Sequence, residues 1–243
     1  MCIRDRYNFE LLALYNNSWG NFDFNATLGG NLYKVNNQTI VTTAKDMKIR
    51  DVVALMSFNE VSVEPYSYRK QINSIYGAVN LGWKHMLYFD ATLRGDQSST
   101  LPISNNMYIY PSFSGSFVFS ELLKLGDKLP YGKVRMSWAQ VGSDTDPYQL
   151  GLVYTKSKFA YPGYTIGYIS NGTIPNKDLK PTKTNSFEMG LELKFLKNRI
   201  GLDFTYYSQL SKNQIMGMAS SSTSGYGYRL ILSLIHISEP TRP

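Results

Sequence analysis

The chain has 243 residues, of which 43% are hydrophobic and 14% aromatic, and its 25 Lys and Arg against 18 Asp and Glu give a formal net charge of +7. One cysteine and two histidines exclude a disulfide framework and leave too few ligands for a zinc site. The basic excess is scattered, which favours solvated loops over a nucleic-acid-binding surface, and no stretch approaches the roughly 18 consecutive apolar residues of a membrane-spanning helix.

The two ends of the chain predict an origin outside the gene. Residues 1–6 can be encoded by ATG TGT ATA AGA GAC AGR, and residues 232–237 by CTG TCT CTT ATA CAC ATC. The second DNA sequence is the reverse complement of the first over the length that they share. This relation is typical of a sequencing adapter translated at both ends of a read. We therefore expect adapter-derived segments at 1–6 and 232–243, set aside from fold reasoning, and a genuine segment at 7–231 that is an internal part of a larger product.

Six strands are predicted before residue 143 from the alternation of apolar and polar residues. They are expected at about 8–16, 22–35, 70–84, 86–97, 109–120 and 132–142. Trp19-Gly20-Asn21 and Lys84-His85 are expected to form turns between neighbouring strands. Residues 36–69 lose the alternation and contain Pro65, which predicts a long loop or irregular strands. Residues 121–131 are expected to form a connector with a short helical turn.

The clearest element is a predicted hairpin over residues 186–207. One arm alternates Phe187, Met189, Leu191, Leu193 and Phe195 with polar residues and glycine, and the other arm continues the pattern after a turn at Lys197-Asn198. Each arm is about ten residues long, which suits a tilted transmembrane strand. Strands of soluble sandwiches are usually about half that length.

Long connections are expected at 143–182 and at 219–228, whereas the turns between them are short. In outer-membrane barrels the periplasmic turns are short and the extracellular loops long. The chain is therefore predicted to be all-β, a partial antiparallel transmembrane β-barrel whose curved sheet has roughly eight to ten strands and long extracellular loops. A secreted β-sandwich with a binding role, such as an adhesin or lectin, is the alternative. A single sheet with a wide apolar face favours the barrel, and two facing sheets favour the sandwich.

Aromatic residues of the 143–182 connection are the candidate site. Their faces can stack on sugar rings or cover apolar ligand surfaces; the alternative is that they pack this loop against itself. The candidates for contact with a substrate or a lid protein are Tyr148, Tyr154, Phe159, Tyr161, Tyr164 and Tyr168. We find no catalytic constellation, no metal site and no cofactor motif. His85, the only histidine of 7–231, lies in a turn, so no enzyme activity is expected.

Four motifs, in order, resemble the barrel of SusC/RagA-type TonB-linked outer-membrane transporters. Arg94-Gly-Asp-Gln-Ser-Ser99 resembles R-x-D-G-S-S, with Gln97 in place of the usual glycine. Tyr110-Pro-Ser-Phe-Ser-Gly-Ser116 resembles F-P-S-x-S, and Lys133 to Gly142 resembles L-K-x-R-x-S-Y-G-x-x-G. Ile174-Pro-Asn-Lys-Asp-Leu-Lys180, with Glu188-Met-Gly-Leu-Glu192 further on, resembles N-P-N-L-K-W-E followed by N-I-G-L-D.

The resemblance implies an outer-membrane active transporter that imports oligosaccharides or peptides. It implies as partners outer-membrane lipids, a SusD-like surface lipoprotein, a glycan or peptide substrate, and a TonB-type energy transducer. The transducer would be engaged through an N-terminal part that this chain does not show. The fragment itself would supply barrel wall and outer loops.

Overall fold

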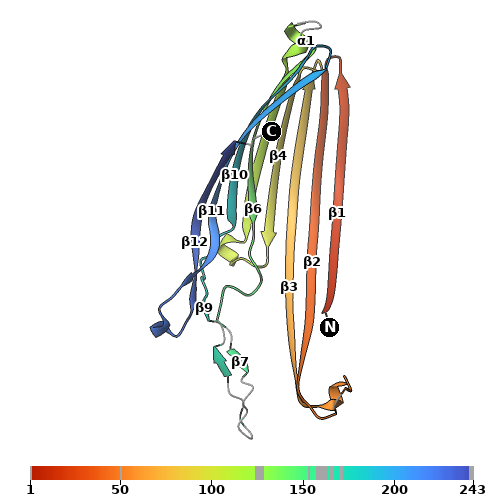
Figure 1. Cartoon of the computed structure of the whole chain (residues 1–243). Coiled ribbons are helices and arrows are strands. Elements are labelled where there is room, and N and C mark those ends of the chain that lie inside the picture. The colour runs from red at the N-terminus through yellow and green to blue at the C-terminus, as the bar shows by residue number, and fades with distance from the viewer. Residues whose placement is uncertain are drawn as a thin grey trace.

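The chain folds as one curved sheet in the computed structural model, which describes residues 2–49, 51–123, 129–152, 154–156, 164, 167–169 and 172–240. Its ten strands lie in the order β1-β2-β3-β4-β5-β6-β10-β11-β12-β9 (Figure 1). The strands are β1(Cys2–Trp19), β2(Phe22–Met47), β3(Phe58–Trp83), β4(Leu87–Ser98), β5(Met107–Val118), β6(Tyr131–Ser143), β9(Thr173–Ile174), β10(Thr182–Phe195), β11(Ile200–Ala219) and β12(Tyr228–Pro240). Every long pair is antiparallel, as predicted, and only the two-residue β9 pairs in parallel, with β12.

The remaining elements are short. The helix α1(Phe119–Leu123) follows β5, and single 3₁₀ turns lie at Leu55–Ser57, Ile103–Asn105 and Ser222–Ser224. The strands β7(Tyr154–Lys156) and β8(Gly167–Ile169) form a separate two-stranded ribbon. No helix within the described ranges has the length and apolar character needed to cross a bilayer.

The turns form where the sequence predicts them. Gly20 joins β1 to β2 with φ of +62°, a conformation that glycine adopts without a Cβ penalty. Lys84 and His85 join β3 to β4 with φ of +51° and +54°. The expected turn at Lys197-Asn198 joins β10 to β11 with φ of +58° and +65°.

Of the two alternatives for residues 36–69, the long loop is wrong for most of the segment, and paired strands are found there. β2 runs to Met47 and β3 starts at Phe58, so the two 26-residue strands pair far beyond the predicted ends and leave a connection of ten residues. Pro65 sits inside β3 opposite Ile40, in a stretch beyond the end of β4, so no strand on the other side of β3 needs its missing N–H. Pro65 therefore lies in a part of β3 that is paired on one side only, where a proline is compatible with a strand.

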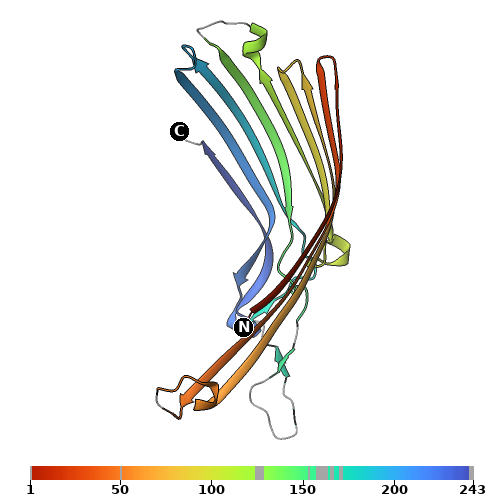
Figure 2. The same cartoon turned by 90° about the vertical axis from the view of Figure 1, so that its right-hand side faces the viewer.

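The connections at the two ends of the sheet differ in length, apart from the twelve-residue β5–β6 connection that carries α1. The short turns and α1 gather at one end, and the connections β2–β3, β4–β5, β6–β10 and β11–β12 gather at the other (Figures 1 and 2). The 143–182 connection carries β7, β8 and β9, and the 219–228 connection is also found, between β11 and β12. We name the end with the long connections the mouth.

One face of the sheet is apolar across the neighbouring strands β2 to β6. Phe24 pairs with Leu81, Leu81 with Phe89, and Phe113 with both Ala91 and Trp138, so the apolar residues lie in rows across neighbouring strands. They are not covered by a second layer: Leu28 is 61% exposed and Leu93 55%. An apolar face of this extent marks a surface that meets a membrane. The partial transmembrane barrel is confirmed, and the sandwich architecture is wrong because no second large sheet faces this one within the described residues.

Candidate functional site

The opposite face of the sheet is polar, and its side chains bond to one another across the strands. Asp90 on β4 accepts hydrogen bonds from Asn80 Nδ2 on β3 at 2.6 Å and from Ser114 Oγ on β5 at 2.8 Å. Thr92 and Ser112 share a 2.6 Å hydroxyl bond one row further toward the mouth. Such bridges hold polar groups at defined positions on a wall that faces water.

Two long side chains of this face each cross a glycine on the neighbouring strand. Arg135 on β6 passes over Gly190 on β10 and reaches Thr205 Oγ1 on β11 at 2.7 Å. Its guanidinium also lies 3.3 Å from Asp203 and 3.8 Å from Glu188. Tyr76 on β3 likewise passes over Gly29 on β2, and its hydroxyl donates to Glu10 on β1. The absence of a Cβ at each glycine makes the crossing possible.

Asp144 fastens the start of the β6–β10 connection to the wall. One carboxylate oxygen is 2.7 Å from Lys70 Nζ on β3, and the other accepts hydrogen bonds from Ser98 Oγ at 2.6 Å and Thr100 Oγ1 at 3.3 Å. Ser98 and Thr100 are buried, which shields the ion pair from water and strengthens it. We call Lys70, Ser98, Thr100 and Asp144 the Asp144 cluster.

A small apolar core lies at the same end of the sheet. Leu101, Tyr108 and Leu179 are buried together, with Tyr110 packed against them. Leu179 belongs to the last residues of the β6–β10 connection, whereas Asp144 belongs to its first. Both ends of this long connection are therefore held at the mouth, one by an ion pair and the other by apolar contact.

A second charged group supports this core. Asp96 on β4 is buried and bonds Arg94 Nε at 2.9 Å, and the hydroxyl of Tyr110 on β5 donates to its other oxygen. Arg94 also donates to Ser74 Oγ at 3.1 Å, and its guanidinium lies 5.5 Å from the ring centroid of Tyr76. The R-x-D motif of the sequence thus forms an ion pair between residues on one side of the strand.

The first residues of the β6–β10 connection lie over β3 and enclose a hollow of about 550 Å³. Tyr33 from β2 and Tyr66 and Tyr68 from β3 line the wall side, and Tyr148 and Asp146 line the side of the connection. The Tyr148 hydroxyl accepts a hydrogen bond from the backbone N–H of Arg69 at 3.2 Å. We call this site the tyrosine hollow. Arg4 and Arg6 also line it.

Tyr148, one of the six residues predicted from the sequence, lines this hollow. Tyr164 is 74% exposed. The backbones of Tyr154 and Tyr168 lie in the β7–β8 ribbon, where Tyr154 pairs with Ile169 and Tyr168 with Thr155. Phe159 and Tyr161 lie outside the described residues. A role of this set in contacting a substrate or lid stays a prediction.

Sequence reasoning missed Tyr33, Tyr66 and Tyr68. Tyr33 lies on the polar side of a predicted strand, so period-two alternation alone places it on the wall. Tyr66 and Tyr68 fall in the segment expected to be a long loop or irregular strands. The alternation of Val61 and Val63 with polar neighbours was the available signal that this segment is a strand.

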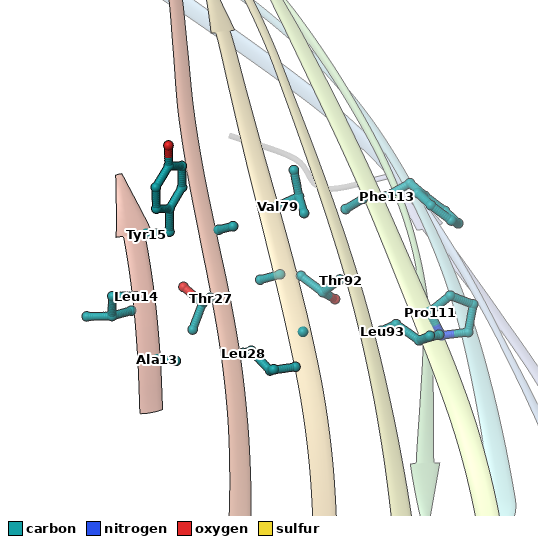
Figure 3. Close-up of a pocket in the computed structure, with 14 residues that line it drawn as sticks. Ala13, Leu14, Tyr15, Thr27, Leu28, Val79, Thr92, Leu93, Pro111 and Phe113 are labelled. Atoms are coloured by element: carbon teal, nitrogen blue, oxygen red, sulfur yellow. The ribbon is translucent and has the colours of Figure 1, made fainter. Parts of the chain in front are cut away.

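The apolar face has a hollow of its own, about 640 Å³, across β1 to β5 (Figure 3). Small residues such as Ala26, Gly77 and Ala91 leave space there between Leu28, Leu93 and other larger side chains. Its lining offers almost no polar group to orient a ligand, so we assign the candidate site to the polar face. Within the described residues no three His, Cys, Asp or Glu side chains gather as metal ligands.

The chain matches known proteins over almost its whole length. Residues 4–234 match the family model described as TonB dependent receptor-like, beta-barrel. TonB-dependent receptor P3 of Formosa agariphila is 25% identical over 210 residues, which is 82% of this chain and 20% of that protein. TonB-dependent receptor SusC of Bacteroides thetaiotaomicron is 30% identical over 147 residues, 57% of this chain and 15% of that protein.

Solved structures agree on the fold. The RagAB peptide transporter superposes with a TM-score of 0.83 at 20% identity, over 94% of this chain and 26% of that one. The siderophore receptor PirA of Pseudomonas aeruginosa gives 0.55 at 17% identity, over 96% of this chain and 38% of that one. The chain spans 15% to 20% of the length of the curated relatives it matches.

Proposed function

This chain belongs to the TonB-dependent receptor β-barrel family, and we propose that it forms part of the wall of an outer-membrane transporter that imports oligosaccharides or peptides. The observation that carries the proposal is the division of one curved sheet into an apolar face and a polar, internally bonded face. The apolar face meets lipid, and the polar face lines the route of the ligand. The expected SusC/RagA-type barrel and its place in the cell outer membrane are confirmed by the family and the relatives.

The partners follow from the same proposal. A TonB-type transducer would supply the energy, and a SusD-like lipoprotein would cover the mouth, where the long connections gather. One similar protein is named a SusC receptor and another a peptide transporter, so both substrate classes belong in the test. The family is one of receptors and transporters, and no catalytic step is part of the proposal.

The test uses the complete gene from the source bacterium in a strain from which it has been deleted. We expect uptake of labelled oligosaccharides or peptides to return with the gene and to disappear again when the transducer gene is deleted. Uptake that is independent of the transducer would contradict the proposal. An intact transporter that takes up neither substrate class would also contradict it.

We also propose that the aromatic residues of the β6–β10 connection contact the substrate or the lid lipoprotein. The connection is held at both ends at the mouth, through Asp144 and Leu179, which supports a role for its middle part. Replacing Tyr161, Tyr164 and Tyr168 together should lower uptake or lid binding. Unchanged uptake and unchanged lid binding would instead assign these residues to packing within the loop.

Residues 1–6 and 232–243 are, in our proposal, not part of the natural protein. Their coding relation as reverse complements supports this assignment. Residues 2–6 extend β1 and residues 232–240 extend β12 at the edges of the sheet, where main-chain hydrogen bonding accepts added residues with little regard to their side chains. Genomic DNA sequenced across both junctions should encode different residues there, and finding the same codons would refute the assignment.

A further inference from the structure

The tyrosine hollow contains two guanidinium groups that come from the segment we propose to be extraneous. The Arg6 guanidinium carbon lies 5.7 Å from the ring centroid of Tyr33, within the range of a cation–π contact. Arg4 Nη2 donates to the Tyr68 hydroxyl at 3.2 Å. Both arginines belong to residues 1–6, so their side chains stand in for cations placed against the genuine wall.

The charge of the remaining lining favours a cation. Lys70, its one genuine basic side chain, is already paired with Asp144 at 2.7 Å. The Asp146 carboxylate is exposed at the rim and makes no hydrogen bond or ion pair with any other residue in the described ranges. Without Arg4 and Arg6 the hollow therefore presents tyrosine faces and one unneutralised carboxylate.

The position of the hollow is fixed by the wall itself. Tyr33 pairs with Ile72 in the β2–β3 ladder, and the Asp144 cluster holds the start of the connection only two residues before Asp146. The Tyr148 hydroxyl, bonded to the Arg69 N–H, holds the other side of the opening. A ligand entering at the mouth meets this hollow on the polar face.

We infer that the tyrosine hollow is a subsite for a cationic side chain, an arginine or lysine of a peptide ligand, in the complete transporter. The aromatic faces supply cation–π attraction and Asp146 supplies the counter-charge. This inference rests on the proposed transport function and on the proposal that residues 1–6 are extraneous. Beyond the proposed function, it predicts that the transporter prefers positively charged ligands, and it names the residues responsible for that preference.

The test measures binding of short peptides to the purified full-length protein in detergent, with the natural residues at positions 1–6. A peptide with a central arginine is compared with one carrying citrulline, which has nearly the same shape and no charge. We expect the arginine peptide to bind about tenfold more tightly. Tyr33→Leu and Asp146→Asn should each reduce that ratio to about twofold or less, whereas Tyr88→Leu, on the same face but outside the hollow, should leave it unchanged.

Two results would overturn the subsite. One is equal binding of the arginine and citrulline peptides by a protein that still imports its nutrient, which leaves the transport function intact. The other is a natural gene that encodes arginine or lysine at positions 4 and 6, because the hollow would then already hold its own cations. If the unaltered protein imports no nutrient, the result would instead contradict the transport function itself.

Discussion

At the scale of single residues, glycine on the polar face allows side chains to link strands that are not neighbours. A Cβ built at Gly190 would lie 2.3 Å from Arg135 Nε, and one built at Gly29 would lie 2.4 Å from the Tyr76 ring. Each glycine therefore allows a side chain from one strand to bond a residue two strands away. Antiparallel ladders link only neighbouring strands, so these crossings add cohesion that backbone pairing does not provide.

The first prediction concerns Gly190→Val. The new side chain occupies the path of Arg135 and separates its guanidinium from Thr205 and Asp203. We expect a loss of about 1–3 kcal/mol in unfolding free energy, measured by urea titration of the full-length barrel in detergent. Gly201→Val is the matched control, because nothing lies within 4 Å of a Cβ at Gly201. Equal effects of the two substitutions would show that the crossing contributes nothing.

At the scale of elements, the β6–β10 connection is defined by its two attachments. Asp144 joins it to β3 and to the segment after β4, and Leu179 joins it to the apolar core at the mouth. The tyrosine hollow depends on the first attachment, since Asp146 and Tyr148 follow Asp144 closely in the chain. A change at Asp144 should therefore act on the whole start of the connection.

The second prediction is that Asp144→Asn loosens this connection. The neutral amide cannot pair with Lys70, and the loss of a partly buried charged bond costs about 2 kcal/mol or more. Limited trypsin digestion of the full-length protein should cleave near Lys156 or Lys177 several-fold faster than in the unaltered protein. Asp146→Asn provides the control, because Asp146 makes no bond to other described residues. Unchanged cleavage in Asp144→Asn would show that the ion pair does not hold the connection.

The sequence predicted the strands best where one face is consistently apolar. Alternation located β4, β5 and β6 to within two residues at each end, because contact with lipid on one face imposes a strict period of two. It also located the β10–β11 hairpin and its turn, but β10 begins at Thr182, four residues before the predicted start, and β11 runs to Ala219, twelve residues past the predicted end. It failed between residues 36 and 69, where β2 and β3 extend past their neighbours and both faces carry polar residues. Nothing in the local sequence marks Asp144 as the residue that holds the start of the connection. Its partners lie 44 to 74 residues away, and local patterns carry no information on such contacts.

At the scale of the whole molecule, the sheet has an apolar face in place of a layered core. The buried apolar residues of the described chain are few and lie mostly at the mouth. Large apolar side chains cover the apolar face and are exposed. Soluble domains reach stability by burying such side chains in protein. This sheet requires hydrocarbon to take that role.

The third prediction tests the assignment of the two faces with two separate arginine substitutions at neighbouring residues of β4. Leu93 lies on the apolar face of β4, and its neighbour Thr92 lies on the polar face, bonded to Ser112. Leu93→Arg should destabilise the folded full-length barrel in lipid vesicles by about 2–4 kcal/mol if the residue lies near the bilayer midplane. Thr92→Arg should cost much less, because its charge remains in water. A larger cost for Thr92→Arg would reverse the face assignment.

The fourth prediction concerns residues 7–231 expressed alone. In this segment β1 is paired on one side only, and β12 is reduced to Tyr228–Ile231, so most of β11 also has no partner on its outer side and both edges offer unpaired backbone groups. Unpaired edges recruit further strands, and the apolar face adds a second adhesive surface. We expect this segment to form β-rich aggregates in plain buffer and to stay dispersed only in detergent, as followed by sedimentation and circular dichroism. The full-length barrel in detergent, whose sheet should be closed, serves as the control and should remain monomeric. A soluble, folded monomer of residues 7–231 without detergent would mean that protein, and not lipid, covers the apolar face.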